Sequence, residues 1–117
     1  MSMLTGRGAR IIFAVPFIIF GVMHILAGPK MAGYVPAWLP LKTLWVYVTG
    51  VALAAAGVAF ILGIKARLAA YLLAVLLLVF MLTVHAPGLP KAASMVAFFK
   101  DLALIGGCLM VAGQVGD

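Results

Sequence analysis

Acidic side chains are almost absent from this sequence of 117 residues. It contains no Glu and only two Asp, of which Asp117 is the last residue and Asp101 lies inside an apolar stretch. Chemistry that needs paired carboxylates is therefore excluded, and neither a nucleophile triad nor a glycine-rich phosphate loop can be assembled. The single cysteine, Cys108, permits no internal disulfide, and we expect it to be a buried small residue. These absences remove most classes of enzyme that act alone.

Metal-ligating side chains are equally scarce. The sequence has two histidines, His24 and His85, and a structural zinc site would need four ligands. Asp101 and Cys108 do not complete such a set, because the cysteine falls about two helical turns farther along the same apolar run. Haem ligation by the two histidines is disfavoured, since no haem-attachment motif accompanies them. We expect no metal site and no haem.

Apolar residues make up most of the chain. Hydrophobic residues account for 68% and charged residues for 9%. Four apolar runs, each close to the roughly 20 helical residues that cross a bilayer, occupy residues 11–28, 44–63, 68–87 and 95–113. None of them alternates apolar with polar residues as a barrel strand would. The sequence predicts an all-α integral membrane protein, a four-helix bundle formed by one domain over residues 1–117.

The first run raises an alternative. It follows Arg7 and Arg10, and a basic segment before an apolar one is also typical of a secretory signal. The apolar stretch continues past Gly21, however, and the segment "HILAG" is a poor cleavage site. We therefore expect the first helix to be retained.

Basic residues give the chain a formal net charge of +6. They flank the apolar runs, so anionic lipid headgroups rather than nucleic acid are the expected partner. Four spans place one group of cations at the face that carries both termini (Arg7, Arg10, Lys65, Arg67) and an equal number at the opposite face (Lys30, Lys42, Lys91, Lys100). Every Arg is in the first group, which favours a multi-pass cell-membrane protein with cytoplasmic termini.

The connections between the runs differ in character. The first, "GPKMAGYVPAWLPLKTLW", contains three prolines, one Tyr and two Trp, a composition typical of the headgroup level. We expect it to cap one end of the bundle from an interfacial position. The second should be a tight turn at residues 63–65, and the third should end at Ser94 as N-cap of the fourth helix.

The polar residues gather at one end of this topology. The first and third helices run in the same direction, so His24 and His85 approach the same membrane face, and the fourth helix starts there. Asp101 would lie roughly 10 Å into that helix. An acid at this depth needs a partner inside the bundle, which the two histidines can supply. The prediction is a proton-transfer cluster of His24, His85 and Asp101 beside a quinone pocket lined by Tyr34, Trp38, Trp45 and Thr83.

A structural interpretation of the same residues stays open. An ion pair or hydrogen bond at Asp101 could simply lock the fourth helix to its neighbours. A histidine in the last turn of a helix also complements the helix dipole without any ligand. Such a histidine can also reach the lipid headgroups.

Several segments resemble a known family when they are taken in order. They are "IIFAVPFIIFGVMHIL", "YVPAWLP", "WVYVTGVALAAAGVAFILGIKARLAA" and "FFKDLALIGG". Their shared features are Gly21-x-x-His24, Pro36-x-x-Leu39-Pro40, Thr49-Gly50, and Lys100-Asp101 before Gly106-Gly107. The chain is similar over nearly its whole length to the DoxX family of small four-helix membrane proteins. The family is named after a subunit of a thiosulfate:quinone oxidoreductase, and the resemblance implies a link to membrane redox or oxidative-stress systems.

Two positions depart from the family's pattern. Relatives often carry Glu where this chain has Leu53, and Asn where it has Asp101. The fold therefore carries over more directly than the activity. We expect a membrane subunit of a redox complex that works with a soluble or membrane partner, linked to quinone and to sulfur, thiol or oxidative-stress chemistry. The alternative is a non-catalytic scaffold, or a protein that binds small molecules or lipid. The sequence leaves the electron donor, any activity of the chain alone and homo-oligomerisation open.

Overall fold

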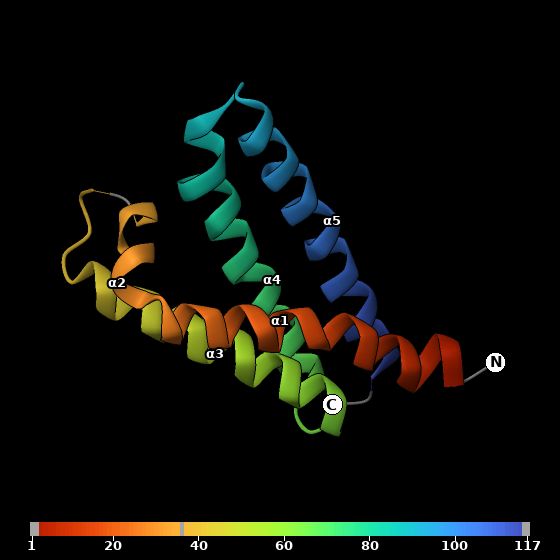
Figure 1. Ribbon diagram of the computed structural model, residues 1–117. Helices are drawn as coiled ribbons and strands as arrows, with labels where there is room; N and C mark the ends of the chain where they lie inside the picture. Colours follow the sequence, from red (N-terminus) through yellow and green to blue (C-terminus); the bar gives the residue numbers. More distant parts are fainter. Residues whose placement is uncertain (1–2, 36, 116–117) are drawn as a thin grey trace.

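The computed structural model describes residues 3–35 and 37–115, and this part of the chain is helical without strands (Figure 1). The four long helices are α1 (Gly8–Leu26), α3 (Lys42–Leu62), α4 (Ala66–Phe80) and α5 (Ala92–Gln114). Shorter helical turns extend α1 backward (Met3–Arg7) and α4 forward (Met81–His85 and Ala86–Gly88). With these extensions, four helical segments are long and apolar enough to cross a membrane. The predicted all-α four-helix membrane bundle is confirmed.

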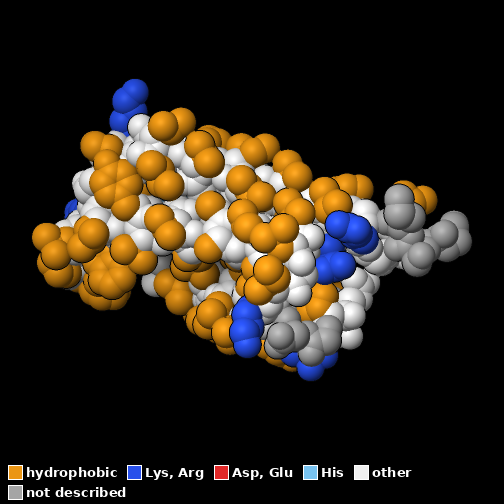
Figure 2. Space-filling view, turned by 90° about the horizontal axis from the view of Figure 1, so that it is seen from below, with side chains coloured by type: hydrophobic (Ala, Val, Ile, Leu, Met, Phe, Trp, Pro, Cys, Tyr) orange, Lys and Arg blue, Asp and Glu red, His pale blue; other side chains and the backbone are white. Residues whose placement is uncertain are grey.

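The surface has the polarity that a bilayer requires. In Figure 2 apolar side chains cover the middle of the visible face, and Lys and Arg side chains lie toward its ends. Large apolar side chains such as Ile12, Leu72 and Met110 are 60 to 72% exposed in the isolated chain. In a soluble protein such exposure would favour aggregation, whereas lipid tails cover it in a membrane.

The bundle is built from two helix pairs. α1 packs mainly against α3, and α4 packs mainly against α5. Figure 1 shows α1 and α3 side by side, with α4 and α5 leaning away from them toward the turn that joins this second pair. The other end is tied together, since Gln114 Nε2 donates to the Thr5 carbonyl at 3.2 Å. The two pairs therefore diverge toward the end that carries α2 (Gly28–Met31) and the start of α5.

Glycines bring α1 and α3 into backbone contact. A Cβ on Gly21 would lie 2.5 Å from the Gly50 carbonyl oxygen, and one on Gly57 would lie 2.9 Å from the Ala14 carbonyl oxygen. In lipid, such close approach supplies dispersion contacts that replace the hydrophobic effect between helices. Gly50 and Gly57 thus form a small-residue face on α3 that lies against α1.

The last helix, α5, approaches α1 closely at one glycine. Gly107 packs beneath the Phe13 ring, which would lie 2.8 Å from an added Cβ. Ala103, which shares its small-residue spacing, is exposed. The contact with α1 is thus a single close approach and not a continuous small-residue face.

The turn between α3 and α4 is as tight as predicted. Gly63 and Lys65 both have positive φ values, 72° and 52°, so the chain reverses in three residues. Arg10 closes the turn from α1 by donating to the Phe60 carbonyl at 3.2 Å. This carbonyl lies in the last turn of α3, where the helix leaves such groups without internal partners.

The predicted N-cap of the fourth helix is wrong. α5 begins at Ala92, and Lys91 precedes it with an extended backbone. The Lys91 carbonyl already accepts the Met95 amide hydrogen at 2.9 Å, so helical hydrogen bonding starts before Ser94 could cap it. Ser94 instead packs against Gly88 in the preceding turn.

Candidate functional site

A cavity of about 610 Å³ lies where the two helix pairs diverge. All four long helices line it, and the connection after α1 contributes Met31, Val35 and Leu39. This connection therefore closes one end of the bundle, as its composition predicts. Most of the lining is aliphatic or aromatic. Six lining side chains carry a hydroxyl, imidazole, ammonium or carboxylate group: His24, Thr49, Thr83, His85, Lys100 and Asp101.

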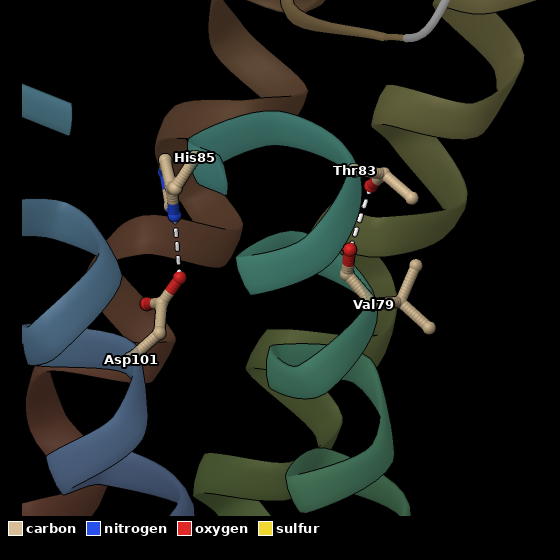
Figure 3. A network of polar contacts seen from close by, with 4 residues as sticks. All are labelled: Val79, Thr83, His85 and Asp101. Atoms are coloured by element: carbon tan, nitrogen blue, oxygen red, sulfur yellow. Dashed lines mark hydrogen bonds and ion pairs between the residues drawn. The ribbon is translucent and has the colours of Figure 1, made fainter. Parts of the chain in front are cut away.

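Asp101 is the buried acid of this cavity. It lies about 14 Å along α5 from Ala92 and is 2% exposed. Its Oδ2 lies 2.5 Å from Nδ1 of His85, whose side chain is 23% exposed (Figure 3). With the carboxylate ionised, the Nδ1–H donates this bond, and the tautomer with a free Nε2 is favoured. Asp101 thus holds the imidazole in one orientation and leaves its other nitrogen available.

A local irregularity of the helix brings His85 to this position. Residues Met81–His85 form a π-helical turn that continues α4. A π turn holds more residues than an α turn, so it changes the direction in which the following side chains point. Thr83 lies in the same turn, and its hydroxyl donates to the Val79 carbonyl at 2.6 Å, away from the His85–Asp101 pair (Figure 3).

His24 lines the cavity from the other helix pair. Its Nδ1 lies 2.6 Å from the Phe20 carbonyl, which can only accept, so Nδ1 carries the hydrogen. Its Nε2 makes no hydrogen bond within the described part of the chain. The ring sits close to α3 because Gly50 has no side chain: a Cβ there would lie 2.7 Å from Cβ of His24. Both histidines therefore engage Nδ1 and leave Nε2 free.

The three predicted proton-transfer residues thus line one cavity, with His85 and Asp101 in direct contact and His24 bonded elsewhere. Their role stays a prediction. Among residues 3–35 and 37–115, no group of three or more His, Cys, Asp or Glu lies close enough to hold a metal ion.

The predicted pocket residues divide into two groups. Trp45 and Thr83 line the cavity. Trp38 does not, and it is 75% exposed, which suits an indole at the headgroup level. The backbone of Tyr34 belongs to a short helical turn, but its side chain lies outside the described part of the structure. Met31, Val35 and Leu39 line the cavity from the same connection.

Sequence reasoning missed three lining residues that shape the site. Phe20 and Lys100 meet across the two helix pairs, with Nζ 5.7 Å from the ring centroid. Leu53, where the family resemblance implies Glu, is 2% exposed and lines the same cavity. Helical spacing could have found Phe20, because it lies one turn before His24 on the same face of α1. No local signal marks Lys100, whose position depends on how α5 packs.

The geometry defines what this site can do chemically. A carboxylate that orients an imidazole, with the far nitrogen free, can pass a proton to or from a bound oxygen atom. Phe17, Phe20, Trp45 and Phe80 surround the same space with aromatic rings. The site therefore suits an apolar, ring-containing molecule that carries hydrogen-bonding oxygens.

Comparison with known proteins agrees with this architecture. The DoxX family model matches residues 7–86, which span α1, α3 and α4. The match ends after His85, so Lys100 and Asp101 lie beyond it. No curated protein and no solved structure matches the chain. A family model that covers most of the sequence, together with the four apolar helices, shows that this chain is a multi-pass membrane protein of the DoxX family.

Proposed function

We propose that this DoxX protein is the quinone-binding membrane subunit of a redox complex. The observation that carries the proposal is the buried Asp101 bonded to His85 in the wall of a large, mostly apolar cavity. A buried acid in a membrane protein costs free energy unless it is paired, and such groups mark proton pathways more often than other intramembrane residues do. The aromatic lining suits a quinone ring.

The proton chemistry follows from the two imidazoles. A quinone becomes a quinol when it takes up two electrons and two protons, one proton on each oxygen. The electrons come from a soluble or membrane partner that oxidises a thiol or sulfur compound. His85, oriented by Asp101, delivers one proton from Nε2 when its ring is protonated, and a protonated His24 on the opposite helix pair delivers the other. Each ring then takes up a new proton from water. In the reverse direction the same nitrogens accept the protons of a quinol.

The first test is chemical analysis of the purified protein. Membranes are extracted with mild detergent, and the purified chain is analysed for bound quinone by mass spectrometry. The proposal expects quinone in a fixed ratio to protein. A protein that carries none, and takes up none from added quinone, contradicts the proposal.

The second test separates chemistry from packing at Asp101. The change Asp101→Asn keeps the shape and a hydrogen-bond acceptor for His85 but removes the exchangeable acid. Quinone-linked turnover in membranes that contain the complex should fall about a hundredfold or more, since positioned acid–base groups contribute factors of this size. Quinone content should stay unchanged. Full turnover with an unaltered pH profile would leave the pair with a structural role only.

The alternative function is a scaffold or a lipid-binding protein. The His85–Asp101 pair also supports this alternative, because it joins the extension of α4 to α5. A double-mutant cycle with His85→Gln and Asp101→Asn measures the coupling in the free energy of unfolding. A charge-assisted hydrogen bond of this kind is worth about 1.5 to 3 kcal/mol. Under the scaffold reading, loss of stability accounts for the whole phenotype of the single variants. Under the quinone proposal, turnover is lost in variants that still fold.

The orientation in the membrane belongs to the same proposal. We infer that α1 begins, and α5 ends, on the cytoplasmic side, because all Arg residues lie at that end. The cavity, at the other end of the bundle, then lies toward the outer leaflet.

A further inference from the structure

Lys100 is a cation at the cavity that lacks an anionic partner. Within the described residues the sole carboxylate is Asp101, and it is bonded to His85. The Lys100 ammonium lies instead 5.7 Å from the centroid of the Phe20 ring. Consecutive residues of a helix point about 100° apart, so Asp101 faces α4 while Lys100 reaches across to α1.

The contact between Lys100 and Phe20 lies on the seam between the two helix pairs. α1 and α5 run antiparallel there, and they touch a second time where Phe13 covers Gly107. On α1, Phe13 and Phe20 are seven residues, or two helical turns, apart. On α5, Lys100 and Gly107 have the same separation. At Gly107 a rigid ring spans the space between the two helices, whereas at Lys100 a long, flexible side chain spans it. Two side-chain contacts, and not close backbone packing, therefore join α1 and α5 beside the cavity.

The surroundings of this ammonium favour an anion. Lys100 lies about 12 Å along α5 from Ala92, inside the membrane-spanning helix. A ring face attracts the cation but supplies no negative charge. Because attraction between opposite charges is stronger in an apolar environment than in water, an anionic oxygen beside Lys100 would be held firmly. The adjoining cavity of about 610 Å³ would receive the apolar part of the same molecule.

We propose that Lys100 binds the anionic oxygen of an apolar ligand that enters the cavity from the bilayer between α1 and α5. The ligand class is an amphiphile with a carboxylate, phosphate or ionised hydroxyl on an apolar body. The Phe20 ring holds the ammonium at the seam until the ligand replaces it. This proposal concerns binding alone, so it stands whether or not the protein takes part in quinone chemistry.

The test uses two probes that differ in charge. A fluorescent long-chain fatty acid and its methyl ester share the apolar body, and their binding to the purified full chain is measured in neutral detergent. The wild type should bind the acid at least about tenfold more tightly than the ester, the size expected for one charge-assisted hydrogen bond. Lys100→Gln should remove this preference and keep the affinity for the ester. Retained ester binding shows that the cavity is still folded.

Two control variants make the outcome specific. Lys100→Arg keeps the charge and should keep the preference for the acid. Lys91→Gln removes an exposed cation from the same end of the bundle, outside the cavity lining, and should change nothing. Equal binding of acid and ester by the wild type, or a preference that survives in Lys100→Gln, overturns the proposal.

Competition identifies the source of the anion. Displacement of the fatty acid by phosphatidic acid assigns the site to a bilayer lipid. Displacement by a long-chain hydroxynaphthoquinone, whose hydroxyl ionises, assigns it to a quinone-type ligand. Displacement by neither contradicts a general site for anionic amphiphiles.

Discussion

Replacement of Gly21 by Ala tests the packing that holds the first helix pair together. The new Cβ would lie 2.5 Å from the Gly50 carbonyl oxygen and 2.7 Å from the Ala54 backbone nitrogen. Both obstacles are backbone atoms of α3, so no side chain can move aside. Ordinary contact begins near 3.4 Å, and the helices must therefore separate by about 0.9 Å at this point.

The cost follows from that separation. A gap of 0.5 to 1 Å removes about a quarter to a half of the dispersion energy of each affected atom pair. Forced expansion of a well-packed core costs about 1 to 3 kcal/mol, and we expect Gly21→Ala to lower the free energy of unfolding by about 2 kcal/mol. Helix propensity does not offset this cost in a membrane mimetic, because the separated helices there remain helical.

The assay is unfolding in mixed micelles with increasing sodium dodecyl sulfate, followed by circular dichroism and tryptophan fluorescence. Gly106→Ala is the matched control. It places the same methyl group in α5, where nothing beyond the adjoining residues and backbone of that helix lies within 4 Å of the new Cβ. The change should alter the free energy of unfolding by less than about 0.5 kcal/mol. An unchanged transition for Gly21→Ala, or an equal loss for Gly106→Ala, refutes the close-packing argument.

Further predictions concern topology and helix ends. Single cysteines are placed at Ser2 and Asp117, both outside the described residues, in a cysteine-free background. They should react alike with an impermeant reagent in intact cells, and differently from a single cysteine at Ala92. Opposite labelling of the two termini contradicts four spans. Arg67→Met removes hydrogen bonds of 3.1 and 2.6 Å to two carbonyls near the end of α5 and should cost about 1 to 3 kcal/mol in the same unfolding assay. Arg7→Met, which removes a cation from the same end, should cost less than about 0.5 kcal/mol.

The sequence and the structure agree where hydrogen bonding in lipid leaves few choices. A run of about 20 apolar residues must satisfy its backbone groups internally, and a helix does so within one segment. The number of helices, their order and the tight turn at Gly63 follow from this constraint. The scarcity of acids likewise singled out Asp101 as the side chain that needs a partner.

The missed features depend on contacts between distant segments. Nothing near Ser94 shows that Lys91 already accepts the first helical hydrogen bond. The composition of the first connection predicts an interfacial cap, but it does not say that Met31 and Leu39 rather than Trp38 turn inward. Local composition sets depth in the membrane, whereas the direction of a side chain is set by the surface that it meets.

By itself, the sequence determined that the chain crosses a membrane as four helices and that its few polar groups collect at one end. Only the tertiary structure decided which of them meet. The π-helical turn directs His85 to Asp101, and the missing side chain of Gly50 leaves His24 against α3. The divergence of the two helix pairs then opens the cavity that Lys100 borders. Apolar periodicity fixes how deep a residue lies, but helix rotation, and with it the choice of partner, comes from close packing between helices.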